Sequence, residues 1–109
     1  MESSYRLPPT ISGMAVHFVG IKGTGMCALA ELFHRSGARV TGSDRPEQFY
    51  TDAILQELGI PYYESFAAEN LPTGVALVIY SAAYNPETNE ELKAAQSRGV
   101  PILKYTDAL

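Results

Sequence analysis

Short apolar segments alternate along the chain with segments whose apolar residues recur at helical spacing. Residues 15–19 are apolar around one histidine and end at Gly20, which is typical of a buried strand. Residues 24–36 follow with a helical period, and Gly37 supplies a stop signal. The predicted inward face of this helix consists of Met26, Leu29, Leu32 and Phe33. The regular structure is therefore expected to begin with a strand and a helix.

Further strands follow at regular intervals. They are predicted at residues 38–43, 61–64, 75–80 and 102–105. The run at 75–80 is apolar throughout, as in a central strand that is covered on both faces. This spacing leaves room for a helix in most of the connections.

Helices are predicted in these connections as well. One spans about residues 51–58, with Ile54, Leu55 and Leu58 facing inward and Gly59 closing it. Another has its start signal at Asn85-Pro86-Glu87 and is expected to run to Arg98. Asparagine can cap a helix, proline suits the first helical position, and an acid favours the positive end of the dipole. Residues 106–109 have the pattern of a further helix that has only begun.

Strands that alternate with helices form parallel βαβ units with right-handed crossovers. The sequence therefore predicts a doubly wound, Rossmann-like α/β fold: a five-stranded parallel sheet in the order 3-2-1-4-5 with helices on both faces. A length of 109 residues allows one domain. We assign residues 14–109 to it. Residues 1–13, which include Ser3, Ser4, Pro8, Pro9 and Gly13, are interpreted as a flexible leader.

Composition and charge exclude several classes of protein. Hydrophobic residues make up 46% and charged residues 18% of the chain, which is enough apolar material for a core and argues against disorder. The net charge of −4 comes from interspersed acids and bases, so neither nucleic acid nor an anionic membrane is expected as a partner. A single nucleotide remains possible, because backbone N–H groups can hold a phosphate without a basic surface.

The chain shows no signs of export or of a metal site. Cys27 is the only cysteine, so no intrachain disulfide can form. No run approaches the roughly 18 apolar residues of a membrane span, and residues 1–9 lack the order of a signal peptide. His17 and His34 have no cysteines or acids at ligand spacing. We expect a cytoplasmic protein without a bound metal.

A glycine-rich segment lies between the first predicted strand and the first predicted helix. It consists of Gly20, Ile21, Lys22, Gly23, Thr24, Gly25 and Met26. Glycines let the backbone approach a ligand closely, and the N–H groups of a helix N-terminus attract anions. The spacing differs from the usual dinucleotide fingerprint and lacks the Gly-Lys-Ser/Thr ending of an ATP-binding loop. We predict a diphosphate site; the Lys22 side chain either pairs with a phosphate or points into solvent.

Two strand ends are expected to flank this loop. Ser43 and Asp44 end the second strand, where an acid is well placed for ribose hydroxyls, unless Asp44 only caps the next turn. Ser81, Ala82 and Ala83 follow the fourth strand. Their small side chains either leave room for a base or sugar or simply allow a tight exit from the sheet. No arrangement of catalytic residues is recognised.

Several short runs of the chain together carry a family resemblance. They are His17–Met26, Ala30-Glu31, Val40–Asp44, Ser81–Ala83, Asn85–Glu87 and Val100–Ile102. On these runs, which extend over nearly all of residues 14–109, the chain resembles the N-terminal domain of the Mur ligase family. It is most similar to members that join L-alanine to UDP-N-acetylmuramate. Members that attach murein tripeptide share much of the pattern.

The resemblance implies a role in peptidoglycan precursor synthesis. In this family a first domain binds the UDP part of UDP-N-acetylmuramate, a central domain holds ATP and Mg²⁺, and a last domain binds the amino acid. The muramoyl carboxylate becomes an acyl phosphate, which the amine attacks. For this chain it implies that residues 20–26 hold the UDP diphosphate and that Ser43, Asp44 and residues 81–83 frame the uridine. No cofactor is expected in the chain itself.

The chain departs from the family pattern in three places. Lys22 stands where alanine-adding members usually have a small residue, and Phe66 stands where a histidine commonly precedes the pair Glu69-Asn70. The sequence also stops at Leu109, where the family continues toward its ATP domain. We expect an excised domain that binds UDP-N-acetylmuramate, depends on central and C-terminal domains, and is inactive alone. The alternatives are a stand-alone binding module, a NAD-binding domain of an oxidoreductase and a regulatory nucleotide sensor.

Overall fold

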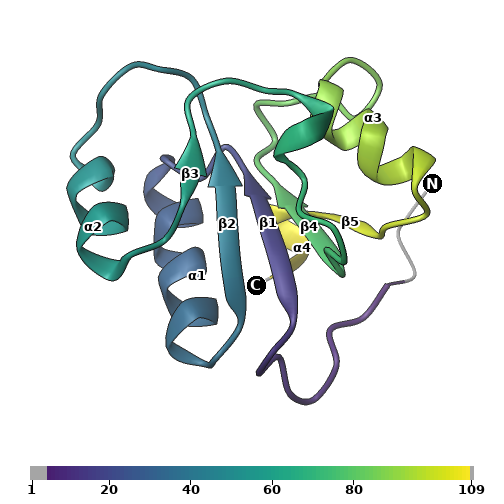
Figure 1. Ribbon diagram of the computed structural model, residues 1–109, viewed down its shortest axis with the longest axis horizontal. Coiled ribbons are helices and arrows are strands. Elements are labelled where there is room, and N and C mark those ends of the chain that lie inside the picture. The colour runs from purple at the N-terminus through teal and green to yellow at the C-terminus, as the bar shows by residue number, and fades with distance from the viewer. Residues whose placement is uncertain (1–4, 109) are drawn as a thin grey trace.

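The computed structural model describes residues 5–108, in which strands and helices alternate along the chain (Figure 1). The strands are β1 (Ala15–Val19), β2 (Arg39–Ser43), β3 (Tyr62–Tyr63), β4 (Leu77–Tyr80) and β5 (Ile102–Lys104). The helices are α1 (Thr24–Arg35), α2 (Thr51–Leu58), the short 3₁₀ helix η1 (Ala68–Asn70), α3 (Glu90–Ser97) and α4 (Tyr105–Ala108).

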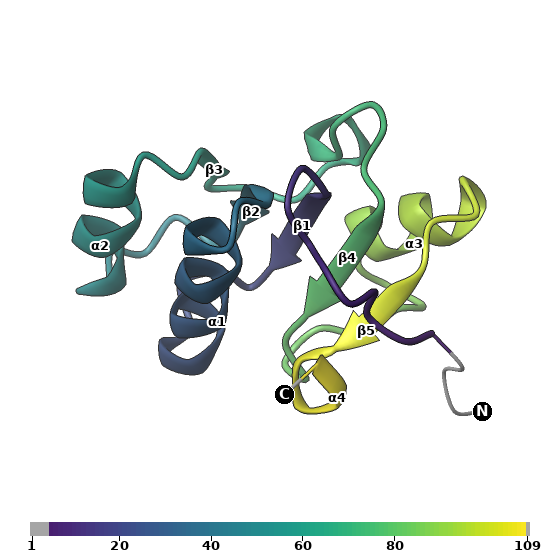
Figure 2. The same ribbon diagram turned by 90° about the horizontal axis from the view of Figure 1, so that it is seen from below.

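The strands form one parallel sheet in the order β3-β2-β1-β4-β5, which confirms the predicted fold and strand order (Figures 1 and 2). All five residues of β1 are buried, because this strand pairs with β2 on one side and β4 on the other. Strand β3 is shorter than predicted, with only Tyr62 and Tyr63 in the sheet. The strand order reverses at β1, and a ligand site is expected at its carboxyl end.

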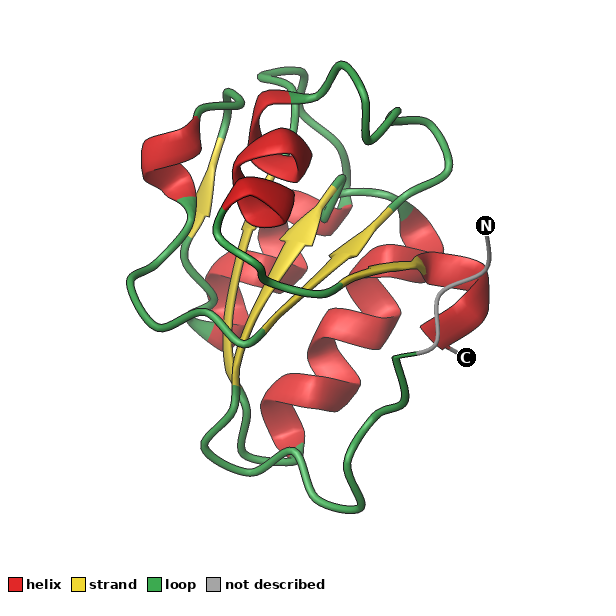
Figure 3. Cartoon of the chain, turned by 90° about the vertical axis from the view of Figure 1, so that its right-hand side faces the viewer, coloured by secondary structure: helices red, strands yellow, loops and turns green. Residues whose placement is uncertain are grey.

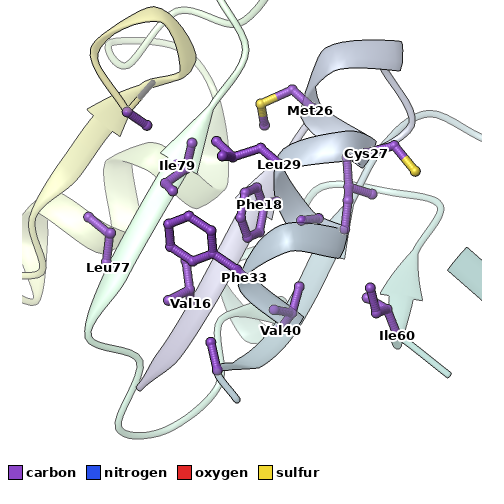
Figure 4. Packing of buried hydrophobic residues seen from close by; sticks show 14 of the residues in the cluster. Val16, Phe18, Met26, Cys27, Leu29, Phe33, Val40, Ile60, Leu77 and Ile79 are labelled. Atoms are coloured by element: carbon purple, nitrogen blue, oxygen red, sulfur yellow. The ribbon is translucent and has the colours of Figure 1, made fainter. Parts of the chain in front are cut away.

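Helices cover both faces of the sheet (Figure 3). The alternate β1 residues Val16 and Phe18 face α1, where the Phe18 and Phe33 rings meet edge to face at 5.6 Å between centroids (Figure 4). Leu55 of α2 and Ala108 of α4 belong to the same buried cluster. On the opposite face Val19 packs with residues of β4 and with Leu92 of α3. The alternation of side chains along a strand therefore builds two cores around a single buried strand.

Two sequence expectations about the helices are wrong. Helix α3 begins at Glu90, and the Asn89 side chain caps it by accepting from the N–H groups of Glu91 and Leu92. Asn85 instead closes a separate turn by accepting from the Glu87 N–H at 2.8 Å. In α1, Leu32 is 59% exposed, because Cys27 and Ala30 belong to the buried stripe and turn Leu32 outward.

The segment before β1 contains no helix or strand between residues 5 and 13, yet it touches the domain. Leu7 and Ile11 pack against the core on the α1 side, and the Gly13 N–H donates to the Gly37 carbonyl at 2.9 Å. Residues 1–4 of the expected leader and Leu109 of the last expected helix lie outside the described residues. Helix α4 itself runs from Tyr105 to Ala108.

None of the helices found between residues 5 and 108 has the length and apolar character that crossing a membrane requires.

Candidate functional site

The glycine-rich loop leaves the sheet where the strand order reverses. Its first residue, Gly20, has a φ of +90°, and a Cβ there would lie 2.9 Å from both the Ser81 Cβ and the Tyr84 ring. The N–H groups of Gly20 and Ile21 donate to the Ser43 carbonyl at 2.8 and 3.1 Å. The loop is thus fixed between the ends of β2 and β4, and the structure brings the predicted segments 20–26, 43–44 and 81–83 together.

The start of α1 presents backbone donors without partners. Gly23 is the N-cap and supplies no side-chain cap, and the first turn contains no acid. Across residues 5–108, no acceptor is found for the N–H groups of Thr24, Gly25 and Met26. Such a helix end carries a partial positive charge and donors that point outward. Its chemistry suits an anion such as a phosphate.

The three glycines of the loop differ in what the fold requires. Gly20 needs its positive φ, and a Cβ on Gly25 would collide with the Tyr105 side chain. Gly23 has a φ of −59°, and a Cβ there would meet nothing closer than 3.5 Å. Neither backbone strain nor packing therefore explains glycine at position 23. An exposed glycine also leaves space for a ligand to approach the backbone closely.

Lys22 follows neither of the two expectations for it, because its side chain is buried beneath the loop. Its ammonium donates to Glu64 at 2.8 Å and to the Glu47 carbonyl at 2.8 Å, and lies 3.2 Å from Asp52. Thr51 also donates to the Lys22 carbonyl at 2.6 Å. Lys22 therefore ties the loop to α2 and to the end of β3, and its charge is neutralised inside the protein.

The Lys22 pKa reflects this environment. Burial alone would lower the pKa of the ammonium, but the hydrogen bonds and charges of Glu64 and Asp52 outweigh burial and raise it. The side chain is therefore a cation at neutral pH. It holds the loop through an ion-pair cluster with Asp52 and Glu64.

Lys22→Met is expected to destabilise the protein by about 2 kcal/mol, because Asp52 and Glu64 lose their shared cation. Urea unfolding measures the effect. Lys93→Met is the matched control, since Lys93 is exposed on α3 and its loss is expected to change stability by less than about 0.5 kcal/mol. Equal stabilities of the two variants would show that the cluster does not hold the loop.

Asp44 is 6% exposed and already engaged within the protein. One carboxylate oxygen accepts from the Lys22 N–H at 2.8 Å, and the other accepts from the Arg45 N–H at 2.8 Å and from the Tyr84 hydroxyl at 3.0 Å. Burial first, and then the Asp44 charge, raise the pKa of Tyr84 to about 12. In this arrangement Asp44 caps the turn that follows it and shapes the glycine-rich loop.

A buried network beneath the site was missed by the sequence reasoning. The Glu91 carboxylate on α3 is fully buried and accepts from His17 Nε2 at 2.7 Å and from the Ser43 hydroxyl. Its other oxygen accepts from the Asn70 amide at 2.8 Å and from the Ala67 N–H at 3.2 Å. Because the Ser43 hydroxyl points into this network, only the Ser43 backbone faces the loop. A histidine in an otherwise apolar strand was the one signal in the sequence.

Beside the loop lies an open cavity of about 280 Å³, between the exit of β4 and the end of β5. It is lined by Tyr80, Lys104 and residues 82–86, so two of the predicted small residues, Ala82 and Ala83, form part of its wall. Ser81 is not in the wall, and its hydroxyl accepts from the Ala83 N–H at 3.2 Å. The Phe66 ring packs against the Tyr84 ring in a tilted arrangement, with 4.9 Å between ring centroids.

Two further features of the site concern metal ligands and the single cysteine. No group of three or more His, Cys, Asp and Glu side chains capable of holding a metal occurs in the described part of the chain. Cys27 is buried on α1, and burial raises the pKa of its thiol. The site therefore offers backbone donors, aromatic rings and one exposed lysine.

The fold and the loop define a Rossmann-like α/β domain in which an uncapped helix start follows the first strand. Its residues 15–109 match the family described as "Mur ligase family, catalytic domain", and the chain belongs to this family. The UDP-N-acetylmuramate–L-alanine ligase of Treponema pallidum (strain Nichols) is 53% identical over 94% of this chain and 21% of its own length. The chain thus spans about a fifth of that relative.

Solved structures of the family are similar in fold. The UDP-N-acetylmuramate–alanine ligase of Thermotoga maritima superposes with a TM-score of 0.78 at 36% identity, over 85% of this chain and 21% of that one. The UDP-N-acetylmuramate:L-alanyl-γ-D-glutamyl-meso-diaminopimelate ligase of Neisseria meningitides gives 0.76 at 25% identity, over 86% and 29%.

Proposed function

We propose that this chain binds the UDP part of UDP-N-acetylmuramate, as the N-terminal domain of an ATP-dependent Mur ligase that forms the amide bond to L-alanine. The diphosphate lies on the N–H groups of Thr24, Gly25 and Met26. The observation that carries the proposal is the uncapped start of α1 next to Gly23, the one loop glycine that the fold does not need. In this role residues 82–84 border the ligand.

We propose L-alanine as the amino acid that the enzyme adds, because this chain is more similar in sequence to an L-alanine ligase than to a ligase that adds a tripeptide. The L-alanine ligase of Treponema pallidum is 53% identical to this chain, whereas the tripeptide-type ligase of Neisseria meningitides is 25% identical. We place ATP and Mg²⁺ in the remaining part of the enzyme, because the glycine-rich loop has no Gly-Lys-Ser/Thr ending. No catalytic step is assigned to residues of this chain.

Asp44 argues against a nicotinamide cofactor as the ligand. Dinucleotide domains use an acid at the end of the second strand to accept the ribose hydroxyls. Here both Asp44 oxygens already accept hydrogen bonds from Lys22, Arg45 and Tyr84. A ribose would have to displace contacts that hold the loop itself.

Thermal unfolding of the chain with UDP-N-acetylmuramate, UDP, NAD or ATP tests the proposal. A ligand at about 100 times its dissociation constant stabilises a protein by roughly 2.7 kcal/mol, which shifts the midpoint of a domain of this size by many degrees. We expect both UDP compounds to raise the midpoint and NAD and ATP to leave it unchanged. A shift with NAD alone would contradict the proposal.

A further inference from the structure

Lys22 is held by hydrogen bonds at each of its polar groups. Its N–H donates to the Asp44 carboxylate at 2.8 Å, and its carbonyl accepts from the Thr51 hydroxyl at 2.6 Å. Its ammonium donates to Glu64 and to the Glu47 carbonyl, both at 2.8 Å. These partners come from the end of β2, from the start of α2 and from the segments on either side of them. The glycine-rich loop is therefore anchored at this one residue by segments that are distant in the sequence.

The anchor at residue 22 sets the direction of the peptide groups that follow it. The Gly23 N–H donates back to the Gly20 carbonyl at 3.2 Å, and the Gly23 carbonyl accepts from the Cys27 N–H at 2.8 Å. The next N–H groups, at residues 24–26, are the ones without an acceptor within residues 5–108. Glycine has unusually free backbone torsions, so a loop with three glycines presents its donors in one direction only if a neighbouring residue is fixed.

The charges of the anchor are spent inside the protein. Lys22 is 2% exposed, and its ammonium lies 3.2 Å from Asp52 and 5.6 Å from the centroid of the Tyr62 ring. The Tyr62 hydroxyl donates in turn to Asp52 at 3.3 Å. The side chains of Asp52 and Glu64 are 13% and 47% exposed. The cluster thus connects the loop to α2 and β3 through side chains that bind one another.

We propose that Lys22 is a positioning residue for the diphosphate: by anchoring the glycine-rich loop to α2 and to Glu64, it raises the affinity for UDP compounds without touching them. The inference rests on the proposed function and adds a consequence to it. A loop that is already ordered loses less conformational entropy when a ligand binds, so loosening the anchor weakens binding. Glu64, whose contact in the cluster is with Lys22, is then expected to influence ligand affinity through the loop.

A double-mutant cycle in ligand affinity tests this role. The dissociation constant for UDP is measured by calorimetry for the wild type, Lys22→Met, Glu64→Gln and the double variant, at a temperature at which urea titration shows each to be folded. We expect Lys22→Met to weaken binding about tenfold and Glu64→Gln about threefold. In the Lys22→Met background, Glu64→Gln is expected to weaken binding no further, because both substitutions break one network.

Val40→Ala is the matched control for a loss of stability. Val40 is buried near the amino end of β2, at the edge of the sheet opposite the loop, so its truncation destabilises the core and leaves the anchor in place. We expect this variant to bind UDP as the wild type does. An equal weakening by Val40→Ala and Lys22→Met would overturn the proposal, since the effect would then follow stability alone.

The sign of the Glu64→Gln effect separates positioning from direct contact. If Lys22 paired with the phosphate itself, removing its competing carboxylate would free the ammonium and tighten UDP binding; that result overturns the proposal. Wild-type affinity in folded Lys22→Met overturns it as well, and both results leave the proposed function intact. If Lys22→Met does not fold, Glu64→Gln, at a half-exposed side chain, still decides the sign. Failure of the wild type to bind UDP removes both proposals.

Discussion

Replacement of Glu91 by alanine is expected to cost about 3–5 kcal/mol of folding stability. The carboxylate is fully buried and accepts four hydrogen bonds from two strands and the segment before β4: His17, Ser43, Asn70 and the Ala67 N–H. Its removal leaves these donors buried without an acceptor and opens a cavity beneath the sheet. The free energy of unfolding from urea titration measures the loss. Since this free energy is typically about 5–15 kcal/mol, the variant is expected to lose a large part of its stability.

Glu90→Ala is the matched control for this variant. Glu90 precedes Glu91 in the same first turn of α3, but its side chain is exposed. Its loss is expected to cost no more than the weak interaction of an acid with the helix dipole, about 0.3–1 kcal/mol. If both alanine variants lose the same amount, the buried network contributes nothing beyond the dipole.

The same network predicts how stability changes with pH. Burial would raise the pKa of the Glu91 carboxyl, but hydrogen bonds from His17, Ser43 and Asn70 outweigh it and lower the pKa below its usual 4.5. The ionised carboxylate therefore contributes stability that is fully present above about pH 4.5 and is lost as the pH falls through the lower folded pKa. Glu91→Gln, with a neutral side chain, is expected to lose this acid-dependent part of the unfolding free energy.

The order of the strands was predictable because the local sequence signals for strands and turns agree with the sheet that forms. The fully apolar run that contains β4 and the glycine after β1 predicted a parallel sheet whose order reverses beside the loop. The start of α3 was not predictable from local signals alone. Asn85-Pro86-Glu87 and Asn89-Glu90-Glu91 both resemble helix starts, and only the second lets the Glu91 side chain reach His17 of β1. That contact joins residues far apart in the sequence.

The polar residues of the site were harder to interpret than its glycines. The sequence placed Lys22, Ser43 and Asp44 near the loop. Their side chains, however, form hydrogen bonds with other groups of the protein. Lys22 could not be assigned because its partners Asp52 and Glu64 belong to α2 and the end of β3, which converge only after folding. A motif predicts position along the chain; the direction of a side chain follows from packing.

Alanine substitutions at Gly20 and Gly23 of the same loop are expected to differ strongly in their effect on folding stability. Gly20→Ala is expected to cost about 3 kcal/mol of stability, because φ is +90° and the new Cβ would press on Ser81 and Tyr84. Gly23→Ala is expected to leave stability within about 0.5 kcal/mol, because its φ of −59° suits alanine and the space around it is open. Urea unfolding of the two variants measures this contrast.

Gly23, which contributes little to stability, is expected to matter for ligand binding. A methyl group on Gly23 would occupy the exposed surface on which a diphosphate approaches the N–H groups of Thr24 and Gly25. We expect Gly23→Ala to lower the affinity for UDP and for UDP-N-acetylmuramate by at least about tenfold, measured by calorimetry. Because Gly23→Ala is expected to fold as the wild type does, its affinity reports on the contact at position 23 alone. Unchanged affinity in this variant would place the diphosphate away from the start of α1.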